Sequence, residues 1–260
     1  MVGKARGVLR AEPSEGVFVH ERHAPAPDLA PFVEHFWFVS WELPGGPVVR
    51  ETLPHPSVHV VFERGSSRVA GVPRGRFTRT LEGTGFVLGI KFRPGGFRPL
   101  LPYAVTRLSG RVLPLDEVFA SGAPDAEEEV LATTCVKERI GAATRFLRER
   151  LPDPDPVAEE AATVVRRILE DPAVRRVEDL ARAFDTNPRS LQRLFREYVG
   201  VSPKWVIRRY RLHEALERMD SGARENWTAL ALDLGYFDQA HFIRDFRALV
   251  GRTPASYDRT

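Results

Sequence analysis

Arginine and glutamine recur at helical spacing in one short stretch of the second half of the chain. Four polar residues stand at positions i, i+3, i+4 and i+7 and would share one face of a helix. They are Arg189, Gln192, Arg193 and Arg196. Arg can bond guanine with two hydrogen bonds, and Gln can do the same with adenine. The pattern predicts base reading in the DNA major groove, with a solvated charged face as the alternative for this helix taken alone.

The residues around this helix are typical of a helix-turn-helix unit. Residues 177–184 predict a first helix, and Asp185-Thr186 predicts a turn. Asn187-Pro188 then specifies the start of the second helix, because Asn caps free amides and Pro fits the first turn, where its missing amide hydrogen costs nothing. A helix that is seated on another helix and presents Arg and Gln suits major-groove reading.

A second helix pair follows near the end of the chain. Residues 227–234 predict its first helix, Gly235-Tyr236-Phe237 a turn, and Asp238 the cap of its second helix. That second helix is expected to bury Phe242 and to direct a set of five side chains outward. The outward residues are Gln239, Ala240, Ile243, Arg244 and Arg247.

One capped helix, expected from Ser202-Pro203 to about Met219, connects the two pairs. A rigid spacer of this kind can place two recognition helices in successive major-groove segments, about 34 Å apart. Between Thr186 and Arg211 there are seven basic residues against one acidic residue, an excess typical of a polyanion-binding surface. The residues expected to contact DNA phosphates are Arg196, Lys204, Arg208, Arg209 and Arg247.

Many residues of this region stand at offsets that match a known family signature. They are Leu180-Ala181, Leu191-Gln-Arg-Leu-Phe195, Gly200-Val-Ser-Pro203, Arg211-Leu212, Ala215, Leu230-Ala231, Gly235-Tyr236, His241-Phe242, Arg244, Phe246 and Gly251-Arg-Thr-Pro-Ala-Ser-Tyr257. On these residues the stretch 157–257 resembles the DNA-binding domain of the AraC/XylS transcription regulators. The resemblance implies base contacts by Arg189, Gln192, Arg193, Gln239, Ala240, Ile243 and Arg244. One departure is Phe184-Asp185 at the first turn, where the family often has Gly.

The front of the chain has strand chemistry instead. The runs 35–41, 58–62 and 86–92 are short, rich in aromatic and branched residues, and bounded by Gly and Pro. Motifs in residues 24–116 partly resemble the uncharacterised β-rich domain that precedes this DNA-binding unit in many regulators. They are Val33-Glu-His-Phe-Trp37, Leu53-Pro54, His59-Val-Val-Phe62, Gly89-Ile-Lys-Phe-Arg-Pro-Gly-Gly96 and Leu113-Pro-Leu115. Because AraC-type sensors commonly use a cupin-like barrel, we expect a small β-barrel here.

The expected fold class is therefore α+β with two domains. Residues 126–151 have the pattern of one amphipathic helix, and the three prolines of residues 152–156 end it and form a stiff linker. We expect a β-rich sensor or oligomerisation domain in residues 1–120, a helical linker region in 121–156, and an all-α double helix-turn-helix domain in 157–260.

The front domain offers few candidates for ligand chemistry. Trp37 and Trp41 would share one strand face and, with His59, could line a small-molecule pocket, although an aromatic core explains the tryptophans equally well. His55 and His59 are about 13 Å apart on a strand, too far to share a metal ion. Cys135 lies in the expected helix and is assigned to packing. No nucleophile with a base and no metal triad stands out, so no catalytic residue, metal or cofactor is expected.

Composition limits the remaining classes. With 260 residues, 43% apolar and 28% charged, the chain excludes wholesale disorder, and its apolar runs are far shorter than the ~20 residues of a membrane helix. A single cysteine and no signal-like apolar core in residues 1–10 favour the cytoplasm. The favoured function is a sequence-specific DNA-binding regulator that responds to a small molecule; the alternatives are a barrel enzyme tethered to DNA and a signal-independent architectural DNA binder. Expected partners are double-stranded DNA, a small-molecule effector, RNA polymerase for an activator, and a second copy of the chain, without a membrane.

Overall fold

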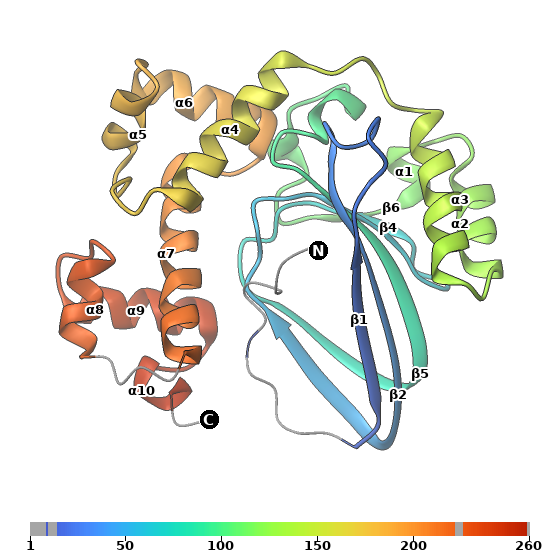
Figure 1. Ribbon diagram of the computed structural model, residues 1–260, viewed down its shortest axis with the longest axis horizontal. Coiled ribbons are helices and arrows are strands. Elements are labelled where there is room, and N and C mark those ends of the chain that lie inside the picture. Colours follow the sequence, from blue (N-terminus) through green and yellow to red (C-terminus); the bar gives the residue numbers. More distant parts are fainter. Residues whose placement is uncertain (1–8, 10–14, 222–225, 259–260) are drawn as a thin grey trace.

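A six-stranded antiparallel sheet forms the front of the molecule, in a computed structural model that describes residue 9, residues 15–221 and residues 226–258 (Figure 1). In spatial order its strands are β1 (Val17–His23), β2 (Val33–Thr52), β5 (Phe77–Phe92), β3 (His59–Phe62), β4 (Arg68–Ala70) and β6 (Val112–Pro114). The edge strands β1 and β6 do not pair with each other within the described residues, so the sheet is open. The expected closed barrel is therefore wrong, although the two-domain α+β class is confirmed.

Three helices cover one face of the sheet: α1 (Leu115–Val118), α2 (Ala123–Ala132) and α3 (Val136–Arg148) (Figure 1). The Phe146 ring on α3 meets the rings of Phe62 and Phe119 edge-on, at centroid distances of 5.9 and 5.2 Å. The helices expected to act as a linker thus contribute side chains to the core of the sheet.

The single helix expected over residues 126–151 is wrong, because α2 and α3 are separate helices that pack against each other. Cys135 stands at the break as the N-cap of α3 and is exposed, so its assignment to packing is also wrong. Nothing in the Thr-Thr-Cys sequence at the break resembles a Pro or Gly signal, and both helices place apolar residues in the core against the sheet.

The other face of the sheet has its own small apolar cluster, formed by Trp41, Leu43, Val61, Leu81 and Val87. Two glycines of β5 leave room for the large rings of β2. A Cβ atom at Gly89 would lie 1.9 Å from the Trp37 ring, and one at Gly85 would lie 2.4 Å from the Trp41 ring. Both glycines are cross-strand partners of those tryptophans, so each indole lies over a residue that has no side chain.

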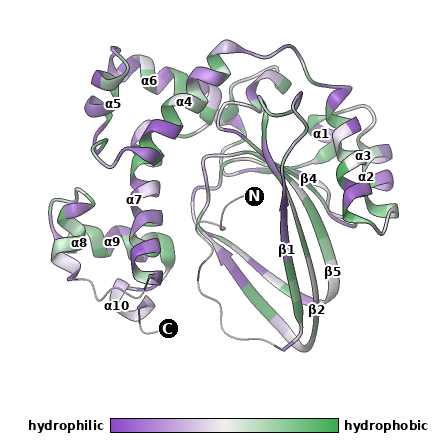
Figure 2. Ribbon diagram, viewed as in Figure 1, coloured by the Kyte–Doolittle hydropathy of each residue, from purple (hydrophilic) through white to green (hydrophobic). Residues whose placement is uncertain are grey.

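The rear of the chain is helical. Its elements are α4 (Pro156–Glu170), α5 (Val177–Ala183), α6 (Pro188–Leu194), the π-helical turn η3 (Phe195–Val199), α7 (Pro203–Asp220), α8 (Trp227–Asp233), α9 (Gln239–Val250) and α10 (Pro254–Tyr257). Hydrophobic and hydrophilic residues alternate along α4 and α7 (Figure 2), which is the pattern of helices with one covered face. None of the helices in residues 15–221 and 226–258 has the length and apolar composition that a membrane crossing requires.

Two short 3-10 helices, η1 (Arg98–Leu100) and η2 (Val105–Arg107), bring the front of the molecule against the rear. The Ser109 hydroxyl donates to the Gly200 carbonyl at 2.6 Å, and both residues are buried. Arg98 and Glu197 form an ion pair at 2.6 Å. These contacts fasten the turn η3, directly after α6, to the front of the molecule.

Candidate nucleic-acid interface

The first candidate reading helix is α6, and its start is specified as the sequence predicts. The Asn187 side chain accepts a hydrogen bond from the Ser190 amide at 2.9 Å, and Pro188 occupies the first helical position. Leu191 is buried in a core cluster to which α4, α5 and α7 also contribute. Three polar residues expected to read bases are all exposed: Arg189, Gln192 and Arg193.

Arg196 is exposed on η3 and not on α6 itself. The helix changes at Phe195 from α to π geometry and ends at Gly200, whose φ of 90° is left-handed. The buried side chains of Phe195 and Val199 hold this turn against α4 and α7. Arg196 is thus close in sequence to the reading residues but sits on a segment with a different helical period.

The second candidate reading helix is α9. Asp238 caps it by accepting from the His241 amide at 2.7 Å, and Phe242 and Phe246 are fully buried beneath it. Three of its expected DNA-contacting residues are exposed, namely Ala240, Arg244 and Arg247. The other two, Gln239 and Ile243, are half-buried.

Each half-buried side chain on α9 has a contact within the domain. The Thr228 hydroxyl donates to the Gln239 side-chain oxygen at 3.0 Å, and Ile243 packs against the core of the second unit. The second reading surface is consequently less polar than the first.

The spacer helix α7 distributes its basic residues over different surroundings. Lys204 is exposed, as expected. Arg208 forms a two-pronged ion pair with Asp245 of α9, at 3.0 and 2.5 Å, while its side chain remains 46% exposed. This pair joins the spacer to the second reading helix and leaves part of the guanidinium open to a phosphate.

The expectation that Arg209 is exposed is wrong, which removes the basis for its predicted phosphate contact. Its side chain is only 2% exposed, lies over the Trp205 ring at 4.4 Å, and donates to the Arg74 carbonyl at 3.3 Å. Burial lowers the pKa of Arg209 to about 9. The face of α7 that carries Arg209 packs toward the front of the molecule.

A set of contacts between the two units has no counterpart in the sequence patterns. Arg175, just before α5, donates to the Asp233 carbonyl at the end of α8 at 2.9 Å. Arg211 on α7 donates to the Arg175 carbonyl. These bonds, with the pair between Arg208 and Asp245, fix the second unit relative to the first. No periodicity marks them, because each joins a side chain to a distant backbone group or helix.

The front domain's candidate ligand residues share one face of the sheet but are already bonded within the protein. The Trp37 indole donates to Nδ1 of His59 at 3.2 Å, and burial lowers the pKa of His59 to about 3. The Trp41 indole donates to the Glu82 carbonyl at 3.0 Å. A ligand there would meet ring surfaces instead of open hydrogen-bonding groups.

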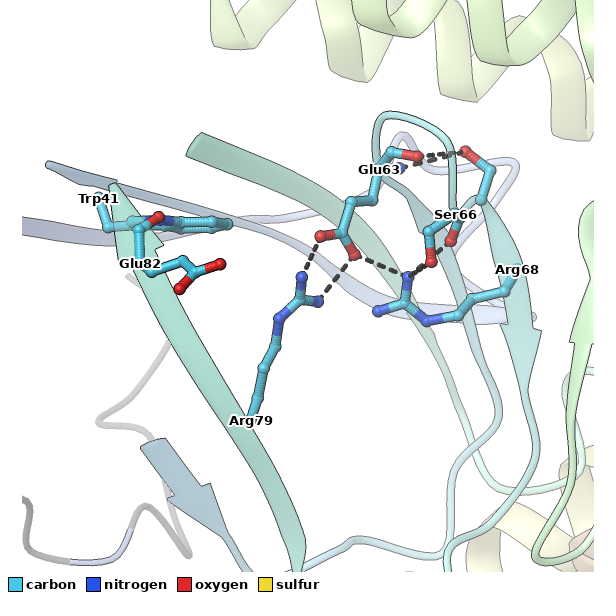
Figure 3. Close-up of polar contacts among 7 residues, drawn as sticks. Trp41, Glu63, Ser66, Arg68, Arg79 and Glu82 are labelled. Carbon is cyan, nitrogen blue, oxygen red and sulfur yellow. Dashed lines mark hydrogen bonds and ion pairs between the residues drawn. The ribbon is translucent and has the colours of Figure 1, made fainter. Parts of the chain in front are cut away.

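An ion cluster lies beside Trp41 (Figure 3). Arg79 of β5 and Arg68 of β4 both bond the carboxylate of Glu63, which follows β3. The two arginines hold the pKa of that carboxyl below its usual value against the opposing effect of burial. The Arg79 guanidinium also lies 5.9 Å from the Trp41 ring centre, so the cluster closes one end of the aromatic face.

The domain matches agree with this arrangement. Residues 180–260 match a helix-turn-helix domain, and residues 21–114 match a domain of unknown function, DUF6597. The molecule is thus a two-domain protein whose rear part is a DNA-binding helix-turn-helix domain of the AraC type. The resemblance to AraC-type regulators, with an uncharacterised β-rich domain in front, is confirmed.

Comparison with curated proteins gives no match. Among solved structures, the chain is similar to ToxT from Vibrio cholerae with a bound unsaturated fatty acid, with a TM-score of 0.39 at 13% identity over 95% of this chain and 96% of that chain. It is similar to ToxT bound to (E)-4-(8-methylnaphthalen-1-yl)but-3-enoic acid with the same score and identity, over 94% of this chain and 98% of that chain.

Proposed function

We propose that this chain is a sequence-specific transcription regulator that reads two successive major-groove segments of double-stranded DNA. The observation that supports this most strongly is the pair of capped helices, α6 and α9, joined by the single spacer α7. The proposed base-reading residues are Arg189, Gln192 and Arg193 on the first helix, and Gln239, Ala240, Ile243 and Arg244 on the second.

The spacing between the helices is part of the proposed mechanism. Two helices read one site only if their separation is fixed to about one helical turn of DNA. The contacts of Arg175, Arg208 and Arg211 between the units support such a fixed separation. The proposed phosphate contacts, from Arg196, Lys204, Arg208 and Arg247, would hold the register without adding sequence information.

We further propose that the front domain senses a small molecule through the sheet face that carries Trp37 and Trp41. Support comes from the contacts of Ser109 and Arg98 with η3, which is continuous with α6. A ligand that moved these contacts would change the position of the first reading helix. By linkage, such a ligand and DNA would alter each other's affinity by the same factor.

A selection of bound fragments from random DNA, performed with the full chain, tests the reading function. We expect an enriched site with two blocks centred about 10 base pairs apart. Gln192→Ala should relax only one block, and Arg244→Ala only the other. If no sequence is enriched, or if both variants relax the same block, the two-helix reading is wrong.

A thermal-shift screen with the full chain tests the sensor. A compound that raises the melting temperature should also change affinity for the selected site, and Trp37→Leu should weaken both effects together. Stabilisation without any change in DNA affinity would leave the front domain as a scaffold.

A further inference from the structure

The turn before α9 contains one residue more than the turn before α6. In each turn, a residue with a left-handed backbone is followed by one whose amide donates to a carbonyl of the preceding helix, Thr186 in the first unit and Tyr236 in the second. The cap of α6 follows Thr186 at once, whereas Phe237 stands between Tyr236 and the cap Asp238. Phe237 is thus an additional residue at the N-terminal end of the second reading helix.

The ring of Phe237 is open to solvent. Phe237 is 89% exposed, and no other large apolar residue in the described part of the chain exceeds 62%. An apolar residue directly before a helix cap often packs on the fourth residue of the helix, which here is Phe242. That contact is already taken, because the Tyr236 ring meets the Phe242 ring at a centroid distance of 5.4 Å. The fold therefore leaves the Phe237 ring uncovered at the end of a proposed reading helix.

The position of Phe237, more than its exposure, indicates what covers it. Single exposed apolar residues are common on protein surfaces. A recognition helix, however, contacts base edges with its N-terminal residues, and Phe237 lies just before Gln239 and Ala240, two of the proposed readers. Among the groups that base pairs present in the major groove, the thymine methyl is the apolar one. A phenyl ring has no hydrogen-bonding atom to read the other groups and no charge to attract a phosphate.

We infer that Phe237 is a further specificity-determining residue, whose ring packs against the methyl group of one thymine in the DNA block that α9 reads. This inference rests on the proposed function, since it requires α9 to lie in the major groove. Burial of one methyl-sized group changes an equilibrium constant about fourfold, which sets the size of the expected preference for thymine. The first unit has the polar Thr186 directly before its cap, so this contact belongs to the second block alone.

The test replaces thymines of the selected site, one at a time, with deoxyuridine, which lacks only the methyl group, and measures the affinity of the full chain. Within the block that Arg244→Ala relaxes, one such replacement should weaken the wild type about fourfold and should have no effect on Phe237→Ala. At the same base, 5-bromouracil should restore wild-type affinity, because bromine is close to a methyl group in size. At every other thymine, Phe237→Ala should respond as the wild type does.

A matched variant and the salt dependence separate a base contact from other effects. Phe77→Ala makes the same change at an exposed phenylalanine of β5 and should keep the full wild-type response to deoxyuridine. The slope of log affinity against log salt should be the same for Phe237→Ala as for the wild type, because an apolar contact releases no counterions. Equal losses on thymine and uracil duplexes, with a changed slope, would assign Phe237 to the sugar-phosphate backbone and overturn the base contact.

The outcomes distinguish this inference from the proposed function. If Arg244→Ala relaxes its block but Phe237→Ala leaves every response to deoxyuridine unchanged, the thymine contact is overturned and the two-helix reading stands. If the full chain selects no DNA sequence, the proposed function fails, and the thymine contact fails with it.

Discussion

The two helix-turn-helix units share a plan but differ in how their reading helices are held. In the first unit, α6 continues directly into η3, and η3 is fastened to the front of the molecule through Gly200 and Glu197. In the second unit, the longer helix α9 is fastened to the spacer through Asp245, and its C-terminal carbonyl at Val250 accepts from Arg76 at 2.8 Å. The front of the molecule therefore contacts both reading helices, the first through η3 and the second through Arg76 at the C-terminus of α9.

The reading surfaces of the two units also differ in polarity. All three readers proposed for α6 are exposed hydrogen-bonding residues, whereas α9 combines Arg244 with Ala240 and the half-buried Ile243. Arg and Gln discriminate bases by paired hydrogen bonds, and small apolar side chains contact the thymine methyl group. We expect the first unit to supply most of the hydrogen-bonded discrimination and the second to supply shape and methyl contacts.

The largest expected effect is on DNA affinity, through the reading surface of α6. Arg193→Ala should cost about 1 to 3 kcal/mol of binding on the selected site and far less on random DNA, because it removes a two-pronged base contact. Binding isotherms on both DNAs measure this. The control is Arg182→Ala on α5. The Arg182 side chain is 80% exposed, and its removal should affect binding to both DNAs slightly and equally. Equal losses for Arg193→Ala on both DNAs would assign Arg193 to a phosphate.

The next largest effect is expected at the contact that attaches the first unit to the front of the molecule. Ser109→Ala should lower the free energy of unfolding by about 1 to 2 kcal/mol, because the buried Gly200 carbonyl loses its donor. Arg76→Ala, which removes a more exposed contact to the second unit, should cost under about 1 kcal/mol. Denaturant unfolding of both variants tests the order. A larger loss for Arg76→Ala would reverse the comparison between the two attachments.

Sequence reasoning succeeded where the determinant is local. The caps at Asn187 and Asp238 and the exposure of Arg189, Gln192 and Arg193 follow from nearby residue types and a helical period. These features depend on backbone groups within one or two turns, so the pattern carries the information.

Sequence reasoning failed where contacts between residues far apart in the sequence determine the structure. The period of α7 marks Arg209 as polar and outward, but only the tertiary structure reveals that the loop carrying Arg74 covers that face. The open sheet likewise depends on strand pairing between segments far apart in the sequence, and no local residue type marks the break at Cys135.

The turns of the two units provide a smaller test. Gly235 turns the second unit with a φ of 73°, and a Cβ atom there would lie 2.7 Å from the side chain of Arg175. Gly235→Ala should lower the free energy of unfolding by about 1 kcal/mol, because an L side chain is strained in the left-handed region. Thermal or denaturant unfolding measures the loss. No loss would mean that the turn relaxes and that Arg175 moves aside without cost.

The first turn should respond in the opposite direction and by less. Asp185 has a φ of 46° at the position where the family often has Gly, and its side chain is exposed. Asp tolerates the left-handed region better than most residues, so Asp185→Gly relieves only part of a strain of about 1 kcal/mol. Glycine also gains conformational entropy in the unfolded chain, which offsets about 0.4 to 1 kcal/mol. The net result should be a stabilisation of at most a few tenths of a kcal/mol.

Asp185→Ala should instead destabilise, because alanine keeps the strain and loses the local hydrogen-bonding capacity of Asp. If Asp185→Gly proves clearly less stable than the wild type, the Asp side chain stabilises the turn itself, and the two units would differ in turn chemistry as well as in attachment.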